Sequence, residues 1–173
     1  MPIRRIPDVQ GQDHVEGPNN ARVTLVEYGD FECPYSAEAV MTVQALQAEL
    51  GDALRFVYRH FPLMHKHPHA FRAAEASEAA GQQRQFWPMY RMLFAYQDAL
   101  TESDLFGYAA ALDLEMTQFE REMTEHTYAS RVQAERQDAE RNGVTGTPTF
   151  FINGMLYEGK DTFEALLEAI QNT

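Results

Sequence analysis

The sequence contains one cysteine, Cys33, and it stands where a thiol could be reactive. Pro34 follows it, and proline is favoured in the first turn of a helix because its missing N–H has no partner there. We therefore predict Cys33 at a helix N-cap, where free backbone N–H groups and the positive end of the helix dipole stabilise a thiolate. We expect an accessible, nucleophilic sulfur. The alternative is an inert, buried cysteine.

A single cysteine also excludes several kinds of site. It rules out an intrachain disulfide framework, a cysteine-rich zinc site and an iron–sulfur cluster. His65, His67 and His69 lie close together, but Pro68 prevents a helical pair of ligands, and no cysteine or carboxylate nearby completes a closed shell. We expect no bound metal and no permanently bound cofactor.

Two strands and a helix must hold Cys33 in place. Residues 21–28 are rich in β-branched and apolar side chains, which predicts a strand that ends before Cys33. Apolar residues then recur at helical spacing from Pro34 to a stop at Gly51, and residues 54–59 alternate like a second strand. This order is a βαβ unit with parallel strands, and it places Cys33 at the carboxyl edge of the sheet.

The rest of the chain supports an α/β fold with an insertion. Residues 64–142 have helical texture, with an aromatic segment that we interpret as core and a mixed-charge run, 131–141, that we interpret as a solvated helix face. A strand, an Asn153-Gly154 hairpin turn, a second strand and a helix follow. We predict an extended lead-in over 1–20, an α/β domain over 21–63 and 143–173, and an all-helical insertion between its second and third strands.

Two segments resemble a known family. Residues 31–36 (FECPYS) resemble the Phe-x-Cys-Pro-x-Cys segment of DsbA-like thiol oxidoreductases of the thioredoxin superfamily. Residues 143–154 (GVTGTPTFFING) resemble the segment that carries the cis-proline of that family. The resemblance implies a thioredoxin fold with Cys33 as the nucleophile. It also implies a substrate-binding surface that includes these residues: Pro34, Tyr35, Thr147 and Pro148.

The chain departs from this family at Ser36, which stands where the second cysteine would be. Serine cannot resolve a mixed disulfide, so donation of an internal disulfide is excluded. Monothiol chemistry remains possible, with an external thiol such as glutathione as co-substrate and a disulfide-containing or glutathionylated protein, or a small thiol, as partner. The Ser36 hydroxyl could donate a hydrogen bond to the thiolate. Tyr35 brings no positive charge, so a less extreme thiolate than in strong oxidants is expected.

Glu27 lies six residues before Cys33, where thioredoxin-like proteins commonly keep a buried acid. The resemblance makes it a third candidate catalytic residue beside Cys33 and Ser36. The alternative is a carboxylate that faces solvent or pairs with an arginine.

Two other functions remain open. Relatives of this fold that bind glutathione use an active-site serine for conjugation or isomerisation, and Ser36 resembles theirs. The chain could also be a binding module without redox activity, because it lacks the second cysteine.

Charge and hydrophobicity restrict the partners. The chain has 14 basic and 26 acidic residues and a formal charge of −12, which disfavours nucleic acid as a partner. No stretch is long and apolar enough to predict membrane insertion, and the first residues lack the apolar region of a signal peptide. We therefore expect a cytoplasmic location, or an exported one if a signal was trimmed. The oligomeric state is not predicted.

Overall fold

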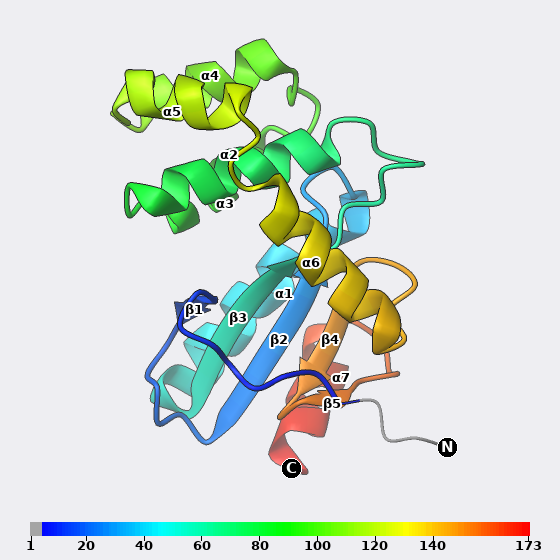
Figure 1. The fold of residues 1–173 in the computed structure, drawn as a ribbon. Coiled ribbons are helices and arrows are strands. Elements are labelled where there is room, and N and C mark those ends of the chain that lie inside the picture. Colours follow the sequence, from blue (N-terminus) through cyan, green and yellow to red (C-terminus); the bar gives the residue numbers. More distant parts are fainter. Residues whose placement is uncertain (1–4) are drawn as a thin grey trace.

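The computed structural model describes residues 5–173, which form one sheet flanked by helices (Figure 1). The strands are β1 (His14–Glu16), β2 (Val23–Gly29), β3 (Leu54–His60), β4 (Thr149–Ile152) and β5 (Met155–Leu156). The helices are α1 (Pro34–Leu50), a 3-10 turn (Gly51–Ala53), α2 (Ala70–Gln82), α3 (Phe86–Ala95), α4 (Glu102–Ala111), α5 (Met116–Thr124), α6 (Ala129–Arg141) and α7 (Phe163–Gln171). The sheet order is β1-β3-β2-β4-β5, which places β2 at its centre.

The predicted βαβ unit is confirmed. β2 and β3 are parallel, in a register that runs from Val23 opposite Leu54 to Gly29 opposite His60. Both strands are buried along nearly their whole length, including the charged residues Glu27 and Arg59. Leu25 of β2 packs in the same cluster as residues of α1 and α7, whereas Val26 packs in the cluster of the opposite face. Helices α1 and α7 therefore cover one face of the sheet.

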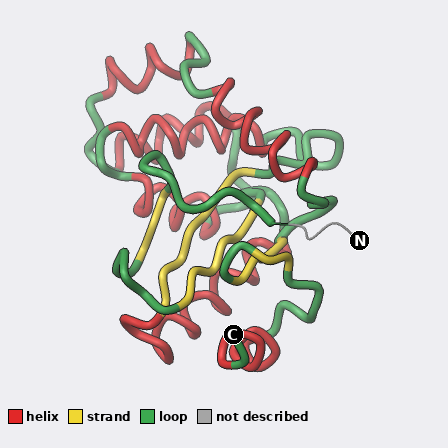
Figure 2. Tube along the Cα trace, turned by 60° about the horizontal axis from the view of Figure 1, so that its bottom comes forward, coloured by secondary structure: helices red, strands yellow, loops and turns green. Residues whose placement is uncertain are grey.

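The other face is covered by the lead-in and α6. The segment before β1 crosses the sheet in both views (Figures 1 and 2), and Ile6 and Ala139 of α6 are buried in the cluster on that face. Arg59 of β3 fixes the lead-in through a buried bidentate pair with Asp13, at 2.9 and 2.8 Å. The lead-in also contains β1, antiparallel to β3, which the sequence analysis missed. Its three residues are too few and too polar to produce a local strand pattern.

The insertion between β3 and β4 consists of α2–α6, and α2–α5 gather at one end of the sheet (Figure 1). Its aromatic segment is core, as predicted, because Phe86, Tyr90 and Phe94 are buried and Trp87 packs against them. The capping box that begins α4 forms between Thr101 and Asp104, as residues 101–104 indicate. The hairpin at Asn153-Gly154 is also confirmed, with positive φ at both residues.

The interpretation of residues 131–141 as a solvated helix face is wrong for the first turn of this segment. Arg131 and Glu135 do form the expected i, i+4 pair, at 3.4 Å. Arg131 also contacts Glu78 of α2 at 3.2 Å, and Glu135 accepts a hydrogen bond from the backbone N–H of His60. This face of α6 is turned towards the protein because Glu78 is buried and needs cationic partners.

Glu78 joins four elements of the fold. Its Oε1 lies 2.8 Å from His14 Nε2 of β1 and 2.7 Å from His60 Nε2 of β3, and Oε2 faces Arg131. Burial acts to raise the pKa of Glu78, but the hydrogen bonds from His14 and His60 outweigh it and hold the pKa well below its ordinary range. The insertion is thereby fixed to the sheet edge through an ionised carboxylate. No helix within residues 5–173 is both long and apolar enough to cross a membrane.

Candidate active site around Cys33

Cys33 lies between β2 and α1, at the N-cap of α1 with Pro34 in the first turn, as predicted. It is a free thiol, and within residues 5–173 no side chain caps this helix end, so the first-turn N–H groups next to Cys33 have no side-chain acceptor. The expectation of an accessible residue is wrong, since only 3% of Cys33 is exposed. Pro34 and Tyr35 beside it are exposed, Tyr35 by 68%. A partner must therefore reach the sulfur across these two side chains.

The Thr147-Pro148 segment meets Cys33 although 114 residues separate the two. The bond between Thr147 and Pro148 is cis, as the sequence resemblance implied. Cys33 Sγ lies 3.6 Å from the carbonyl oxygen of Thr147, within the range of a weak S–H···O hydrogen bond. The turn before β4 thus forms the wall opposite the thiol.

Ser36 does not hydrogen-bond the sulfur among the residues that the structure describes. Its side chain is fully buried, and its Oγ accepts a hydrogen bond from the backbone N–H of Asp30 at 3.2 Å. The hydroxyl therefore closes the loop between β2 and α1. The expected hydrogen bond from Ser36 to the sulfur of Cys33 is not present.

Glu27 is buried in β2, and neither of its carboxyl oxygens has a hydrogen-bond partner among residues 5–173. Both alternatives, a solvent-facing carboxylate and an arginine pair, are therefore wrong. Burial, with a smaller contribution from the charge of Asp161, raises the pKa of Glu27 from 4.5 to about 8. In the sheet, Glu27 lies opposite Tyr58 of β3, whose hydroxyl also lacks a partner. Glu27 is mostly uncharged at neutral pH.

Two histidine–carboxylate pairs hold the loop that carries Cys33, and the sequence analysis did not identify them. His67 Nδ1 lies 2.8 Å from Asp30 Oδ2, and His69 Nδ1 lies 3.0 Å from Glu32 Oε1. His65, the third histidine of the run, is exposed. The histidines contact separate carboxylates, and no cluster suited to a metal ion occurs in residues 5–173.

Gln97, in the loop after α3, is a further residue that the sequence analysis missed. Its Nε2 donates to the carbonyl oxygens of Phe31, at 2.8 Å, and of Cys33, at 2.9 Å. Both residues are buried. The carbonyl of Cys33 also accepts the N–H of Ala37, whereas within residues 5–173 the carbonyl of Phe31 has Gln97 alone as its donor. The insertion thus fixes the backbone of the active-site loop. No local motif marks such a residue, because its partners are more than 60 positions away.

We expect Gln97→Ala to lower the free energy of unfolding by about 1–3 kcal/mol, because the buried carbonyl of Phe31 loses its donor and that of Cys33 loses one of two. Urea unfolding followed by circular dichroism measures this change. Gln137→Ala is the matched control, since Gln137 is exposed on α6. Equal stability of the two variants would show that water replaces the amide of Gln97.

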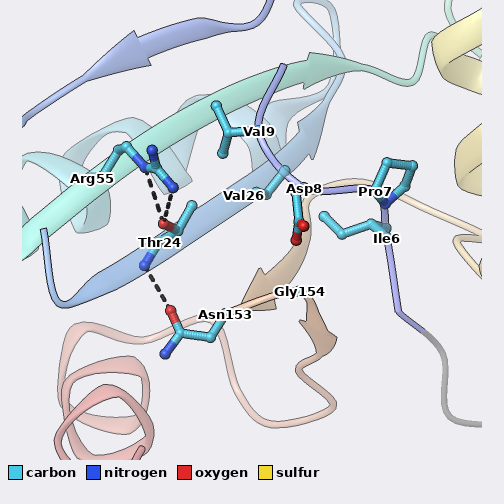
Figure 3. A pocket seen from close by; sticks show the side chains of 9 residues that line it. All are labelled: Ile6, Pro7, Asp8, Val9, Thr24, Val26, Arg55, Asn153 and Gly154. Carbon is cyan, nitrogen blue, oxygen red and sulfur yellow. Dashed lines mark hydrogen bonds between the residues drawn. The ribbon is translucent and has the colours of Figure 1, made fainter. Parts of the chain in front are cut away.

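A groove of about 410 Å³ opens beside this loop, between the sheet domain and the insertion. Pro34, His67, His69 and Gln97 are among the residues that line it. A different cavity, of about 260 Å³, lies under the lead-in and is lined by Thr24 and other residues (Figure 3). Thr24 points to the sheet face opposite Glu27, because side chains alternate along a strand. The groove at Pro34 is the one next to the loop that carries Cys33.

Comparisons with known proteins agree with this geometry. A family described as Thioredoxin matches residues 9–172. The chain is 44% identical over 165 residues to the Na(+)/H(+) antiporter NhaA 1 of Salinispora arenicola, covering 95% of this chain and 25% of that protein. It is 43% identical over 173 residues to the antiporter NhaA of Herminiimonas arsenicoxydans, covering 98% of this chain and 27% of that protein. The chain thus spans about a quarter of the length of these relatives.

Solved structures show the same fold. A thioredoxin-like oxidoreductase from Silicibacter pomeroyi DSS-3 superposes with a TM-score of 0.80 at 28% identity, covering 94% of this chain and 92% of the other. BdbD from Bacillus subtilis superposes with a TM-score of 0.78 at 24% identity, covering 92% and 91%. The predicted α/β thioredoxin fold with a helical insertion is confirmed, and it is DsbA-like.

Proposed function

Because this chain belongs to the thioredoxin family and is DsbA-like, we propose that it is a thiol–disulfide oxidoreductase that works through Cys33 alone. The observation that carries the proposal is the position of its only cysteine. Cys33 is at the N-cap of α1, and its Sγ lies 3.6 Å from the carbonyl oxygen of Thr147. This arrangement suits a nucleophilic thiolate next to a backbone edge that can hold a substrate.

In the first step, the Cys33 thiolate attacks one sulfur of a disulfide. A mixed disulfide forms with Cys33, and the other sulfur leaves as a thiolate. Cys33 has then lost its proton, so the carbonyl oxygen of Thr147 loses its donor and is free to accept a backbone N–H of the bound partner. Exposed Pro34 and Tyr35 provide the surface over which that partner approaches.

The second step requires an external thiol, because the chain has no other cysteine. Glutathione or another low-molecular-weight thiol attacks the mixed disulfide and releases Cys33. The partner would be a disulfide-containing or glutathionylated protein, or a small thiol. Glu27 would contribute a buried, uncharged carboxyl group to the site.

The burial of Ser36 argues against the rival function of a glutathione transferase or isomerase. Its Oγ is inaccessible and already accepts the N–H of Asp30, so it is poorly placed to activate a substrate. A binding module without redox activity is the remaining alternative, and a test of Cys33 reactivity distinguishes it.

Oxidised glutathione tests the proposal directly. We expect a mass increase of one glutathione on Cys33 at neutral pH, which reduced glutathione then removes, because the helix N-terminus stabilises the attacking and leaving thiolate. Mass spectrometry of the intact protein measures both steps, and Cys33→Ser is the control that gains no adduct. If the folded wild-type protein forms the adduct no faster than its urea-unfolded form, the result would support the binding module instead.

A further inference from the structure

Asp30 is a buried carboxylate at the carboxyl end of β2 that holds a histidine beside the active site. Its Oδ1 accepts the backbone N–H of Glu32 at 2.7 Å, and its Oδ2 accepts the N–H of Leu63 and contacts His67 Nδ1, both at 2.8 Å. Three partners fix the orientation of this carboxylate. His67 is therefore attached to the same loop that carries Cys33.

The pairing determines which nitrogen of His67 is free. An ionised carboxylate only accepts hydrogen bonds, so Nδ1 carries the hydrogen in this pair. In the neutral ring, Nε2 is then a proton acceptor, and residues 5–173 offer no hydrogen-bond partner to it. His67 and Pro34 line the same groove of about 410 Å³, which is large enough for a small thiol.

We infer that His67, oriented by Asp30, accepts the proton of the external thiol that resolves the mixed disulfide on Cys33. The inference rests on the proposed monothiol function and adds a proton acceptor to its second step. Resolution by a small thiol creates this need, because a neutral thiol is a poor nucleophile and the chain has no second cysteine of its own.

The S–H hydrogen of the incoming thiol moves as a proton to His67 Nε2, and the resulting thiolate attacks the partner's sulfur in the mixed disulfide. A new disulfide forms between thiol and partner, and the bond to Cys33 breaks with its electron pair on Sγ. The incoming sulfur is oxidised and Cys33 is reduced to a thiolate. The imidazolium, paired with Asp30, then returns its proton to water in the groove.

Other charged groups face this groove and influence His67. Glu32 and His69 form the neighbouring pair, and Asp98 lies on the insertion side. Glu32 and Asp98 are acidic, and they stabilise the imidazolium formed in the step. His69 is more exposed than His67 and its partner Glu32 is less buried than Asp30, so His69 is held less firmly.

Resolution of a preformed adduct isolates the second step. Wild-type protein carrying glutathione on Cys33 is mixed with 2-mercaptoethanol, a neutral thiol, and loss of the adduct is followed by mass spectrometry from pH 6 to pH 10. His67→Asn is the test variant, because its amide still donates to Asp30 but has no acceptor in place of Nε2. His65→Asn is the matched control on an exposed histidine.

We expect His67→Asn to resolve the adduct about ten-fold or more slowly near pH 7. The difference should disappear near pH 10, where the thiol ionises without help. Formation of the adduct should be unchanged, because no external thiol has to lose a proton in that step. In the wild type, but not in His67→Asn, the rate near pH 7 should exceed the rate that ionisation of the thiol alone supplies. Equal rates for His67→Asn and wild type, or a wild-type rate that follows only thiol ionisation, would overturn the inference and leave the proposed function intact. Failure of the wild type to form the adduct would overturn both.

Discussion

The free energy of unfolding is expected to fall as the pH rises from about 4.5 to about 8, and Glu27→Gln is expected to abolish most of this fall. Burial raises the pKa of Glu27 to about 8, with a smaller contribution from the charge of Asp161. Below about pH 4.5 the carboxyl is protonated in both the folded and the unfolded chain. Between the two pKa values only the unfolded chain releases the proton, so stability decreases with rising pH.

The full loss from this group is roughly 3–5 kcal/mol above pH 8, where the folded chain must also carry the buried charge. Urea unfolding curves at closely spaced pH values measure it. Glu38→Gln is the control, because Glu38 is exposed on α1 and should leave the pH dependence unchanged. If Glu27→Gln keeps the same fall in stability over this range as the wild type, the carboxyl of Glu27 is already ionised at neutral pH in the folded protein.

Ser36→Cys is expected to convert the chain into a dithiol oxidoreductase. Positions 33 and 36 are one helical turn apart at the start of α1, and Ser36 is buried beside the same loop. The new thiol should attack the mixed disulfide within the molecule and close a bond with Cys33. The oxidised variant should then form disulfides in a reduced model protein, which the wild type cannot do with one cysteine.

Peptide mass mapping of the oxidised variant identifies the bond between positions 33 and 36, and gain of activity in the refolding model protein measures its transfer. Ser36→Ala is the matched control, since it also removes the acceptor of the Asp30 N–H but adds no sulfur. If the Ser36→Cys variant folds but keeps two free thiols under oxidising conditions, the side chains at positions 33 and 36 point too far apart to form a disulfide.

The local elements of the fold could be predicted from the sequence because their signals lie within a few residues of one another. Pro34 and Gly51 bound α1, and Asn153-Gly154 defines the last hairpin. The apolar spacing of α1 reflects the face that it buries, and the alternating residues Leu54, Phe56 and Tyr58 of β3 pack in one cluster. Strand β1 was not predicted, because a three-residue strand depends on its pairing with β3 rather than on its own pattern.

The candidate site was predicted in part. The lone Cys33 and its place at the N-cap follow from residue identity and spacing. That Ser36 replaces a second cysteine follows only from the family resemblance. The meeting of Cys33 with Thr147 was expected only from the resemblance, since no rule of local spacing relates residues 114 positions apart.

Only the tertiary structure decided the chemical environment of these residues. The burial of Cys33, the raised pKa of Glu27, the Asp30–His67 pair and the clamp of Gln97 on the loop all depend on how distant segments pack. Solvation, charge and hydrogen bonding at a side chain are set by whatever lies within a few ångströms in space. Local sequence specifies neighbours along the chain, and so it determined the lone cysteine and its helix, whereas the packing of the insertion against the sheet determined what surrounds them.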